Sequence, residues 1–266
     1  MRFVLNACEQ NAGSKAAAFC TVFRQLKQFD LDVLVIVADS EKLYFQGLDG
    51  SHVCLFEIEL MKSWFDSFEY EDGVDESVIA IPPVSLDKSL GTRQSGQSIQ
   101  IEHVGGAAIL TLRLLGGGDD CIDKEFGLHL SIVDGFERMD VPVQEYDVDL
   151  TVRSKRFSNV IDQLALFSAN VTIRCNEDAV RMRAKGSIGS MSATIDGDDD
   201  VVAYAIVEGF ELEQSYSLRF LKMMAAFSGL SEDAYLGWGI DKPMTLRYEL
   251  GNDSRVQFFM APRLGE

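Results

Sequence analysis

The sequence has few of the residues that usually carry catalysis. Its 266 residues include three histidines, His52, His103 and His129, and none lies in an H-E-x-x-H or H-x-E pattern. No G-x-S-x-G motif is present, and no cysteine has a local partner signature. We therefore expect a protein that is not an enzyme and that needs no metal or other cofactor. An active site assembled from distant residues, such as that of a hydrolase, stays an open alternative.

Cysteine and long apolar runs are also scarce. The five cysteines are odd in number and none is at metal-ligand spacing, which argues against a disulfide framework or a zinc site. No apolar run approaches the roughly 20 residues that span a bilayer. The first residues, MRFVL, have no signal-peptide pattern. We expect a soluble, intracellular protein without a membrane partner.

Basic residues are outnumbered by acidic ones, and the formal net charge is −18. Residues 1–133 carry 10 basic and 20 acidic residues, and residues 134–266 carry 14 and 22. Because phosphate contacts need Lys and Arg, this balance argues against nucleic-acid binding unless the basic residues gather on one surface. Three acidic or glycine-rich segments, Glu69–Glu76, Gly116–Asp120 and Asp196–Asp200, are interpreted as solvated turns because they lack calcium-loop and phosphate-loop spacing.

Apolar periodicity predicts the same order of elements twice. Helices are predicted at 18–29, 85–91, 157–167 and 216–227. Strands are predicted at 33–37, 42–47, 53–60, 98–103, 107–115, 171–175, 179–184, 190–195, 234–239, 244–250 and 255–260. Each half therefore reads helix, strands, helix, strands, which indicates an α+β domain of antiparallel sheets with helices on one face, built twice. We expect domains at 1–133 and 148–266, joined by an extended connector at 134–147 that contains Pro142.

Four segments resemble, in order, the motifs of one family. Leu43–Leu60, LYFQGLDGSHVCLFEIEL, resembles the signature strand–turn–strand of the proliferating cell nuclear antigen (PCNA) family, with Gln46, Asp49 and Ser51 among its matching positions. WFDSF at 64–68, VPVQEY at 141–146 and FFMAPR at 258–263 are similar to three further motifs of that family. The resemblance covers essentially the whole chain.

The resemblance implies a DNA clamp fold. Two similar domains per subunit would form a homotrimeric ring whose helices line a hole around double-stranded DNA. The residues assigned to the DNA-facing surface are Arg24, Lys27, Lys88, Arg93, Arg153, Lys155, Arg156, Arg219 and Lys222. An ordinary solvated helix face is the alternative for each. The acidic residues fall in loops and strands, so we expect an acidic outer surface that discourages DNA binding there.

The family's partners insert a short motif with aromatic anchors under the connector. The corresponding lining would be Leu48, His52, Leu55, Met139, Val141, Pro142, Tyr146, Pro243, Phe259, Met260, Ala261 and Pro262. Leu48, Leu55 and Met260 could instead be core residues. The family's subunits meet by edge-strand pairing, which assigns the interface to 124–132 and 187–195, with Phe126, Leu128, Leu130, Ile188 and Met191.

The implied function is that of a sliding clamp, a processivity factor that tethers DNA polymerases and other replication and repair proteins carrying PCNA-interacting motifs. A clamp loader is the further expected partner, and the expected location is the nucleus, or a viral replication site for a viral source. A subunit of a heteromeric, checkpoint-type clamp is the alternative. The sequence departs from the family at Asn159 and Asp162, where arginine is frequent, and at Glu177, where the eukaryotic family carries a modified lysine.

Overall fold

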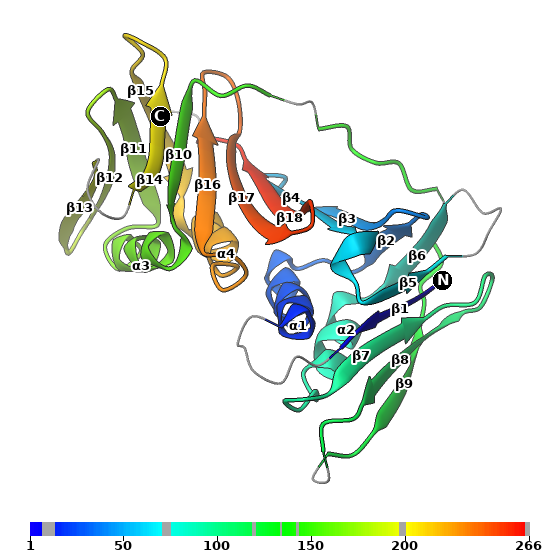
Figure 1. The fold of residues 1–266 in the computed structure, drawn as a ribbon. Coiled ribbons are helices and arrows are strands. Elements are labelled where there is room, and N and C mark those ends of the chain that lie inside the picture. Colours follow the sequence, from blue (N-terminus) through cyan, green and yellow to red (C-terminus); the bar gives the residue numbers. More distant parts are fainter. Residues whose placement is uncertain are drawn as a thin grey trace. The chain divides into compact units, whose positions relative to one another are not determined.

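The computed structural model describes residues 1–6, 14–70, 76–118, 121–133, 135–141, 144–196 and 201–263. The chain divides into two compact units (Figure 1). Unit 1 comprises residues 1–50, 57–140 and 250–255, and unit 2 comprises 51–56, 141–249 and 256–266. No helix in the described ranges is long and apolar enough to cross a bilayer.

Unit 1 is built on antiparallel strands. One sheet has the order β5-β1-β7-β8-β9, and further strands follow the order β4-β3-β2-β6. The strands are β1 (Arg2–Leu5), β2 (Leu34–Ala38), β3 (Lys42–Leu48), β4 (Cys54–Met61, of which 57–61 belong to this unit), β5 (Ser67–Glu69), β6 (Ser77–Ile81), β7 (Ser98–Glu102), β8 (Ile109–Leu115) and β9 (Lys124–His129). The helices are α1 (Lys15–Leu26), the 3₁₀ turn η1 (Lys27–Phe29), the 3₁₀ turn η2 (Lys62–Trp64) and α2 (Pro83–Leu90).

Unit 2 repeats this arrangement. One sheet has the order β13-β12-β11-β15, and further strands follow the order β14-β10-β16-β17-β18. The strands are β10 (Val148–Arg153), β11 (Asn170–Asn176), β12 (Ala179–Gly186), β13 (Gly189–Ile195), β14 (Val201–Ile206), β15 (Leu212–Ser217), β16 (Asp233–Trp238), β17 (Met244–Gly251) and β18 (Ser254–Met260). The helices are α3 (Ser154–Leu164) and α4 (Leu218–Ala225).

The element order is therefore β-α-five strands-α-three strands in both halves of the described chain. Strand pairing repeats as well: β1 lies between β5 and β7, and β10 lies between β14 and β16. The antiparallel α+β class predicted from periodicity is confirmed by the strand pairing. The strands β1, β5, β6, β10, β14 and β15 are not among the predicted elements.

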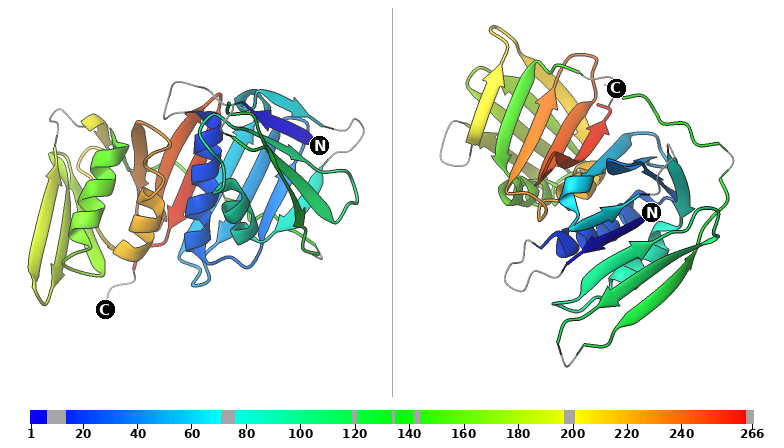
Figure 2. Two further views of the ribbon diagram at one scale, coloured as in Figure 1. Left: turned by 90° about the horizontal axis from the view of Figure 1, so that it is seen from below. Right: turned by 45° about the vertical axis from the view of Figure 1, so that its right-hand side comes forward.

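Each helix is held by an apolar face that packs on its own unit. On α1 the buried face includes Phe19, Val22, Phe23 and Leu26, and the side chain of Ser14 caps the helix by accepting a hydrogen bond from the Ala17 N–H at 3.1 Å. The apolar faces of α3 and α4 are buried in the same way. Figure 2 shows these two helices beside the strands of their unit. The two helices of each unit lie against one another, α1 with α2 and α3 with α4. The polar sides of the helices are consequently left to solvent.

The segment between the units has no regular secondary structure in its described part. Residues 135–141 and 144–146 are neither helix nor strand, as the extended connector predicts. Its first part is attached to β3 in unit 1, where the side-chain amide of Gln46 donates to the Met139 carbonyl and accepts from the Met139 N–H, each at 2.8 Å. Arg138 lies over the ring of Tyr44, 4.7 Å from its centroid, and pairs with Glu76 at 2.9 Å.

Candidate nucleic-acid interface and partner site

The helices expose basic side chains opposite their buried faces. Arg24, Lys88, Lys155 and Arg219 are exposed, and no ion-pair partner is found for them within the described ranges. Arg219 also lies 5.4 Å from the centroid of the Phe220 ring. These four side chains are the part of the exposed basic surface of the helices that is best placed to meet an external anion.

Other predicted DNA-facing residues are engaged by acids. Lys27 Nζ lies 3.0 Å from Asp87 Oδ2 in unit 1, and Lys222 Nζ lies 3.2 Å from Asp162 Oδ1 in unit 2. Each pair links the two helical segments of its unit, and each lysine is about half exposed. An exposed pair of this kind is worth about 0–1 kcal/mol to folding, so its main effect is to reduce the positive charge of the helix surface.

Arg153 and Arg93 also have partners within their own units. Arg153 ends β10 instead of opening α3, and its Nη1 lies 2.7 Å from Glu232 and 2.8 Å from Asp233. Arg93 is half-buried, and its Nε donates to the Gln97 carbonyl at 2.7 Å. Both guanidinium groups are less available to phosphate than their positions in the sequence imply.

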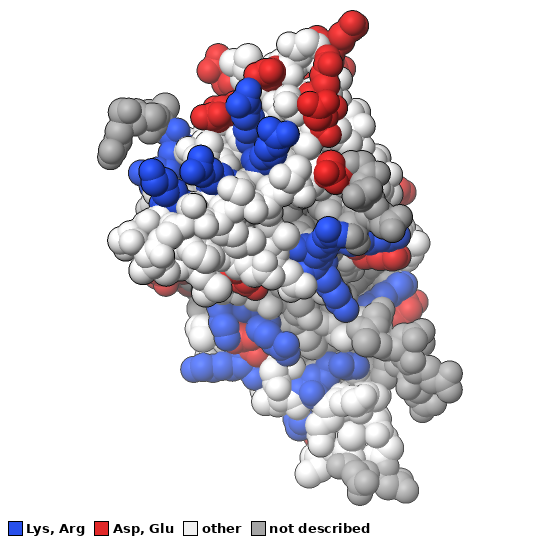
Figure 3. Space-filling model, turned by 90° about the vertical axis from the view of Figure 1, so that its left-hand side faces the viewer, with Lys and Arg blue, Asp and Glu red and all other residues white. Residues whose placement is uncertain are grey.

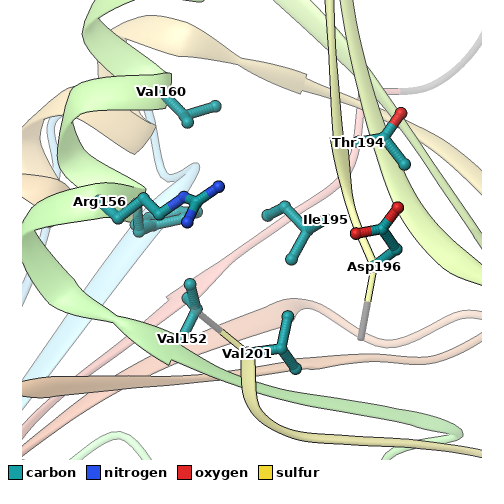
Figure 4. A pocket seen from close by; sticks show the side chains of 8 residues that line it. Val152, Arg156, Val160, Thr194, Ile195, Asp196 and Val201 are labelled. Atoms are coloured by element: carbon teal, nitrogen blue, oxygen red, sulfur yellow. The ribbon is translucent and has the colours of Figure 1, made fainter. Parts of the chain in front are cut away.

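Arg156 lies at a small pocket of unit 2 (Figure 4). The pocket is formed by the first turns of α3, the ends of β10 and β13 and the start of β14. Its lining residues are Val152, Arg156, Phe157, Val160, Thr194, Ile195, Asp196 and Val201. Arg156 extends from the helix toward the β13 side, with Asp196 at the opposite side of the pocket (Figure 4). The lining is mostly apolar. The pocket is therefore a gap in the apolar packing at the edge of the sheet, and the charged side chains of Arg156 and Asp196 lie beside it.

The sheet β13-β12-β11-β15 carries a basic surface that is not among the features predicted from the sequence. Arg181, Arg183 and Lys185 alternate with the buried Met182 and Ala184 along β12. Their side chains therefore point away from the core, and Figure 3 shows Lys and Arg gathered on this side of the molecule, with Asp and Glu along one rim. The sequence places the acidic residues in loops and strands, but the strand β12 exposes three basic side chains. The basic surface could have been predicted, because residues 181–185 have the pattern Arg-x-Arg-x-Lys and alternate residues of a strand share one face.

The predicted partner-site residues are divided between the units. Leu48 and Met139 belong to unit 1, and the others belong to unit 2, with Pro142 outside the described residues. Leu48, Leu55, Val141, Tyr146, Pro243, Phe259 and Pro262 are half-buried, while His52, Met139 and Ala261 are exposed. Met260 is completely buried, which makes it a core residue of unit 2, the alternative recognised from the sequence.

Two local contacts position partner-site residues of unit 2. The Ala261 N–H donates to the Val53 carbonyl at 3.0 Å, which holds the segment after β18 beside the start of β4. Tyr146 packs directly on Gly237, where an added Cβ would lie 2.7 Å from its ring. Burial raises the pKa of the Tyr146 hydroxyl, so the phenol stays neutral.

The predicted interface strands are the outermost strands of their sheets. β9 pairs only with β8, and β13 pairs only with β12, within the described residues. On β9 the inward side chains Phe126 and Leu128, and Leu130 just beyond it, are only half-buried, although they lie on the same side as the core residues of β8. Met191 on β13 is half-buried, and Ile188 in the preceding turn is 76% exposed. Both edges thus combine unpaired backbone with uncovered apolar surface.

The repeated antiparallel α+β architecture can be compared with known proteins. The family model for the C-terminal domain of proliferating cell nuclear antigen matches residues 140–263. The chain is similar to the proliferating cell nuclear antigen of Chaetomium thermophilum, with 27% identity covering 83% of this chain and 85% of the relative. It is also 23% identical to proliferating cell nuclear antigen 1 of Plasmodium falciparum (isolate K1 / Thailand), over 86% of this chain and 87% of the relative. A third relative is proliferating cell nuclear antigen 2 of Drosophila melanogaster, 22% identical over 84% of this chain and 86% of that protein.

Residues 140–263 thus resemble the C-terminal domain of the proliferating cell nuclear antigen family, and most of the chain is similar to proteins of that name.

Proposed function

We propose that the chain is a subunit of a sliding clamp, a ring that encircles double-stranded DNA and tethers DNA polymerases and other replication and repair proteins to it. Its role is mechanical and needs no catalytic residue or cofactor. The observation that carries the proposal is the two-sided character of the helices, each with an apolar face buried in its unit and basic side chains left exposed.

The basic side chains of the helices suit a sliding contact. Arg24, Lys88, Lys155 and Arg219 can reach phosphate oxygens, which carry no sequence information, and so they would orient the ring without arresting it. The acids that pair with Lys27 and Lys222 lower the charge of this surface. A ring held on DNA by its closed shape needs no tight contact. A helix surface with few positive charges is therefore sufficient for sliding.

The two sheet edges support closure of the ring. Pairing β9 of one subunit with β13 of the next would satisfy the unpaired backbone of both strands and cover Phe126, Leu128, Leu130, Ile188 and Met191. The two edges differ in sequence, so the contact is head-to-tail, and a head-to-tail contact generates a closed ring when its rotation closes. We propose three subunits, domains at 1–133 and 148–266, and the connector at 134–147.

The partner site is proposed at the half-buried and exposed apolar residues around the connector. Leu48, His52, Leu55, Met139, Val141, Pro142, Tyr146, Pro243, Phe259, Ala261 and Pro262 would accept the aromatic anchors of a partner motif, while Met260 supports them from the core. A clamp loader would open the ring. The nucleus is the proposed location.

The test combines assembly and activity. The purified chain should have the mass of three subunits by light scattering and should increase the length of DNA that a cognate polymerase synthesises on primed circular DNA in the presence of a loader. Replacing Lys155 and Arg219 with Gln should reduce that stimulation while leaving the trimer intact. A monomer without stimulation would contradict the proposal, and a monomer that assembles only with different subunits would indicate a heteromeric clamp.

A further inference from the structure

The surface of β12 that faces away from the core carries three basic side chains in a row. We name Arg181, Arg183 and Lys185 the basic stripe. All three are exposed, and the residues between them are buried, so the three side chains stand on one face of the sheet. Alternate residues of a strand are separated by about 6.8 Å, twice the rise per residue. The stripe is therefore a straight and evenly spaced row of positive charges on a chain with net charge −18.

The stripe is not neutralised by neighbouring acids in the described part of the chain. No ion pair or side-chain hydrogen bond is found there for Arg181, Arg183 or Lys185. Arg174, which lies opposite Arg181 in the register of β11 and β12, differs because it pairs with Glu211 at 3.1 Å. Glu211 thus neutralises Arg174 and not the stripe.

Hydroxyl side chains border the stripe on both sides. Thr172 on β11 and Ser192 on β13 both lie opposite Arg183. Ser190 lies opposite Lys185, and Thr194 lies opposite Arg181. The β13 hydroxyl residues are exposed, and Ser and Thr hydroxyls are, with Arg and Lys, frequent donors to phosphate oxygens. A charged row with three hydroxyl residues along its β13 side and Thr172 on its β11 side fits a phosphodiester backbone.

We propose that the basic stripe binds the sugar–phosphate backbone of a single nucleic-acid strand that runs along β12. An extended single strand places successive phosphates in a line with a spacing close to that of alternate residues in a β-strand, so three consecutive phosphates meet three cations. A B-form backbone winds away from a flat sheet after a few phosphates. The stripe itself has no aromatic side chain, so bases are not stacked and the contact is independent of sequence.

Within unit 2 the stripe points away from the core, whereas α3 and α4 pack on the strands of the same sheet, and the inference does not depend on the proposed function. The helices would contact the encircled duplex, whereas the stripe would hold a separate, unpaired strand. An acidic peptide is disfavoured as the occupant because the side chains of the stripe and of the border residues Thr172, Ser190, Ser192 and Thr194 are charged or carry hydroxyl groups and supply no apolar anchor.

The test measures binding of a fluorescently labelled oligothymidine to the full chain by anisotropy at several salt concentrations. Three contacts to a single strand predict a slope of about −2 for the logarithm of the association constant against the logarithm of salt concentration. The variant Arg181→Gln, Arg183→Gln, Lys185→Gln should lose at least tenfold in affinity at low salt, with the slope reduced by about two. All three side chains are exposed, so unchanged circular dichroism and Tm are expected of this variant.

The matched control removes the same charge from the helices: Lys88→Gln, Lys155→Gln, Arg219→Gln. This helix variant should keep oligothymidine binding and lose polymerase stimulation. The stripe variant should lose oligothymidine binding and keep polymerase stimulation. The two readouts therefore show separately whether the inference or the proposed function fails. Unchanged oligothymidine binding by the stripe variant would overturn the inference. Tighter binding of a duplex of equal length, or of polyglutamate, with loss in the stripe variant would overturn it in favour of a duplex or an acidic peptide.

Discussion

Lys222 on α4 and Asp162 on α3 form an ion pair, with Nζ 3.2 Å from Oδ1, on the helix surface proposed to face DNA. The first unit has a counterpart, since Lys27 after α1 pairs with Asp87 on α2 at 3.0 Å. The two pairs have opposite order along the chain, with the lysine on the first helical segment in unit 1 and on the second helix in unit 2. In both units an aspartate therefore neutralises the positive charge of one lysine on the surface proposed to contact DNA.

Replacing Asp162 with Asn should strengthen the interaction with DNA. The change releases Lys222 and removes one negative charge, and each additional phosphate that the surface neutralises steepens the salt dependence of duplex binding by about 0.9. We expect a few-fold higher affinity for duplex DNA at low salt, measured by anisotropy, with little change in Tm. Glu208→Gln removes an exposed negative charge in the loop between β14 and β15 and should have a smaller effect. Equal effects of the two variants would show that net charge, and not the helix surface, controls binding.

Replacing Gln46 with Met should detach the first part of the connector from β3. The side chain keeps its length, but the Met139 N–H and carbonyl lose their two partners, each worth about 0.5–1.5 kcal/mol. Hydrogen exchange of the Met139 amide should become faster by roughly tenfold or more. Arg138→Lys should leave the Met139 amide protected because it does not alter the hydrogen bonds of Gln46. Protection of Met139 that persists in Gln46→Met would contradict this assignment.

Replacing Ile188 with Asp should weaken assembly without unfolding the subunit. Ile188 is 76% exposed in the isolated chain, so its loss costs little there. If the residue is buried at the proposed interface, each interface loses about 1.5–3 kcal/mol, which is roughly tenfold to a hundredfold in affinity. Light scattering across a dilution series should show dissociation at higher concentration than for the original chain. Ile240→Asp, 56% exposed in the turn after β16, is the control and should assemble normally.

Glu57 should make the fold less stable as pH rises toward neutrality. Burial, and then the neighbouring charge of Glu59, raises the pKa of the Glu57 carboxyl above its ordinary value. The folded state then binds more protons than the unfolded state between the ordinary and the raised pKa, so stability falls as pH rises through that window. Glu57→Gln should raise the Tm at neutral pH and flatten its dependence on pH over the mildly acidic range.

Glu59→Gln provides the contrast for that experiment. The Glu59 side chain is 13% exposed and pairs with Lys42 at 2.6 Å and with Arg255 at 2.8 Å. Its removal breaks the ion pairs of two partly buried cations, so the Tm at neutral pH should fall. A rise in Tm for Glu59→Gln, or a fall for Glu57→Gln, would contradict the roles assigned to the two carboxylates.

Much of the architecture could be predicted because it depends on local periodicity. The apolar face of α1 and the alternation of β12 and β13 are readable within short windows, and the helix-then-strands order repeats in both halves. β5, with three residues, is too short for any period to be read. β10 alternates cleanly between buried and exposed positions and could have been predicted from the same rule.

The repeated order of elements, the apolar helix faces and the family-like motifs could be predicted from the sequence, because each depends on residues close together in the chain. Which charges are available depends instead on how the helices and strands pack. Asp162 and Lys222 are 60 residues apart, and their pairing depends on how α3 packs against α4. The same holds for Arg153, which is held by two acids, and for Met260, which packing places in the core. A charge or an apolar side chain acts through its neighbours in space, and those neighbours are set by packing and not by sequence distance.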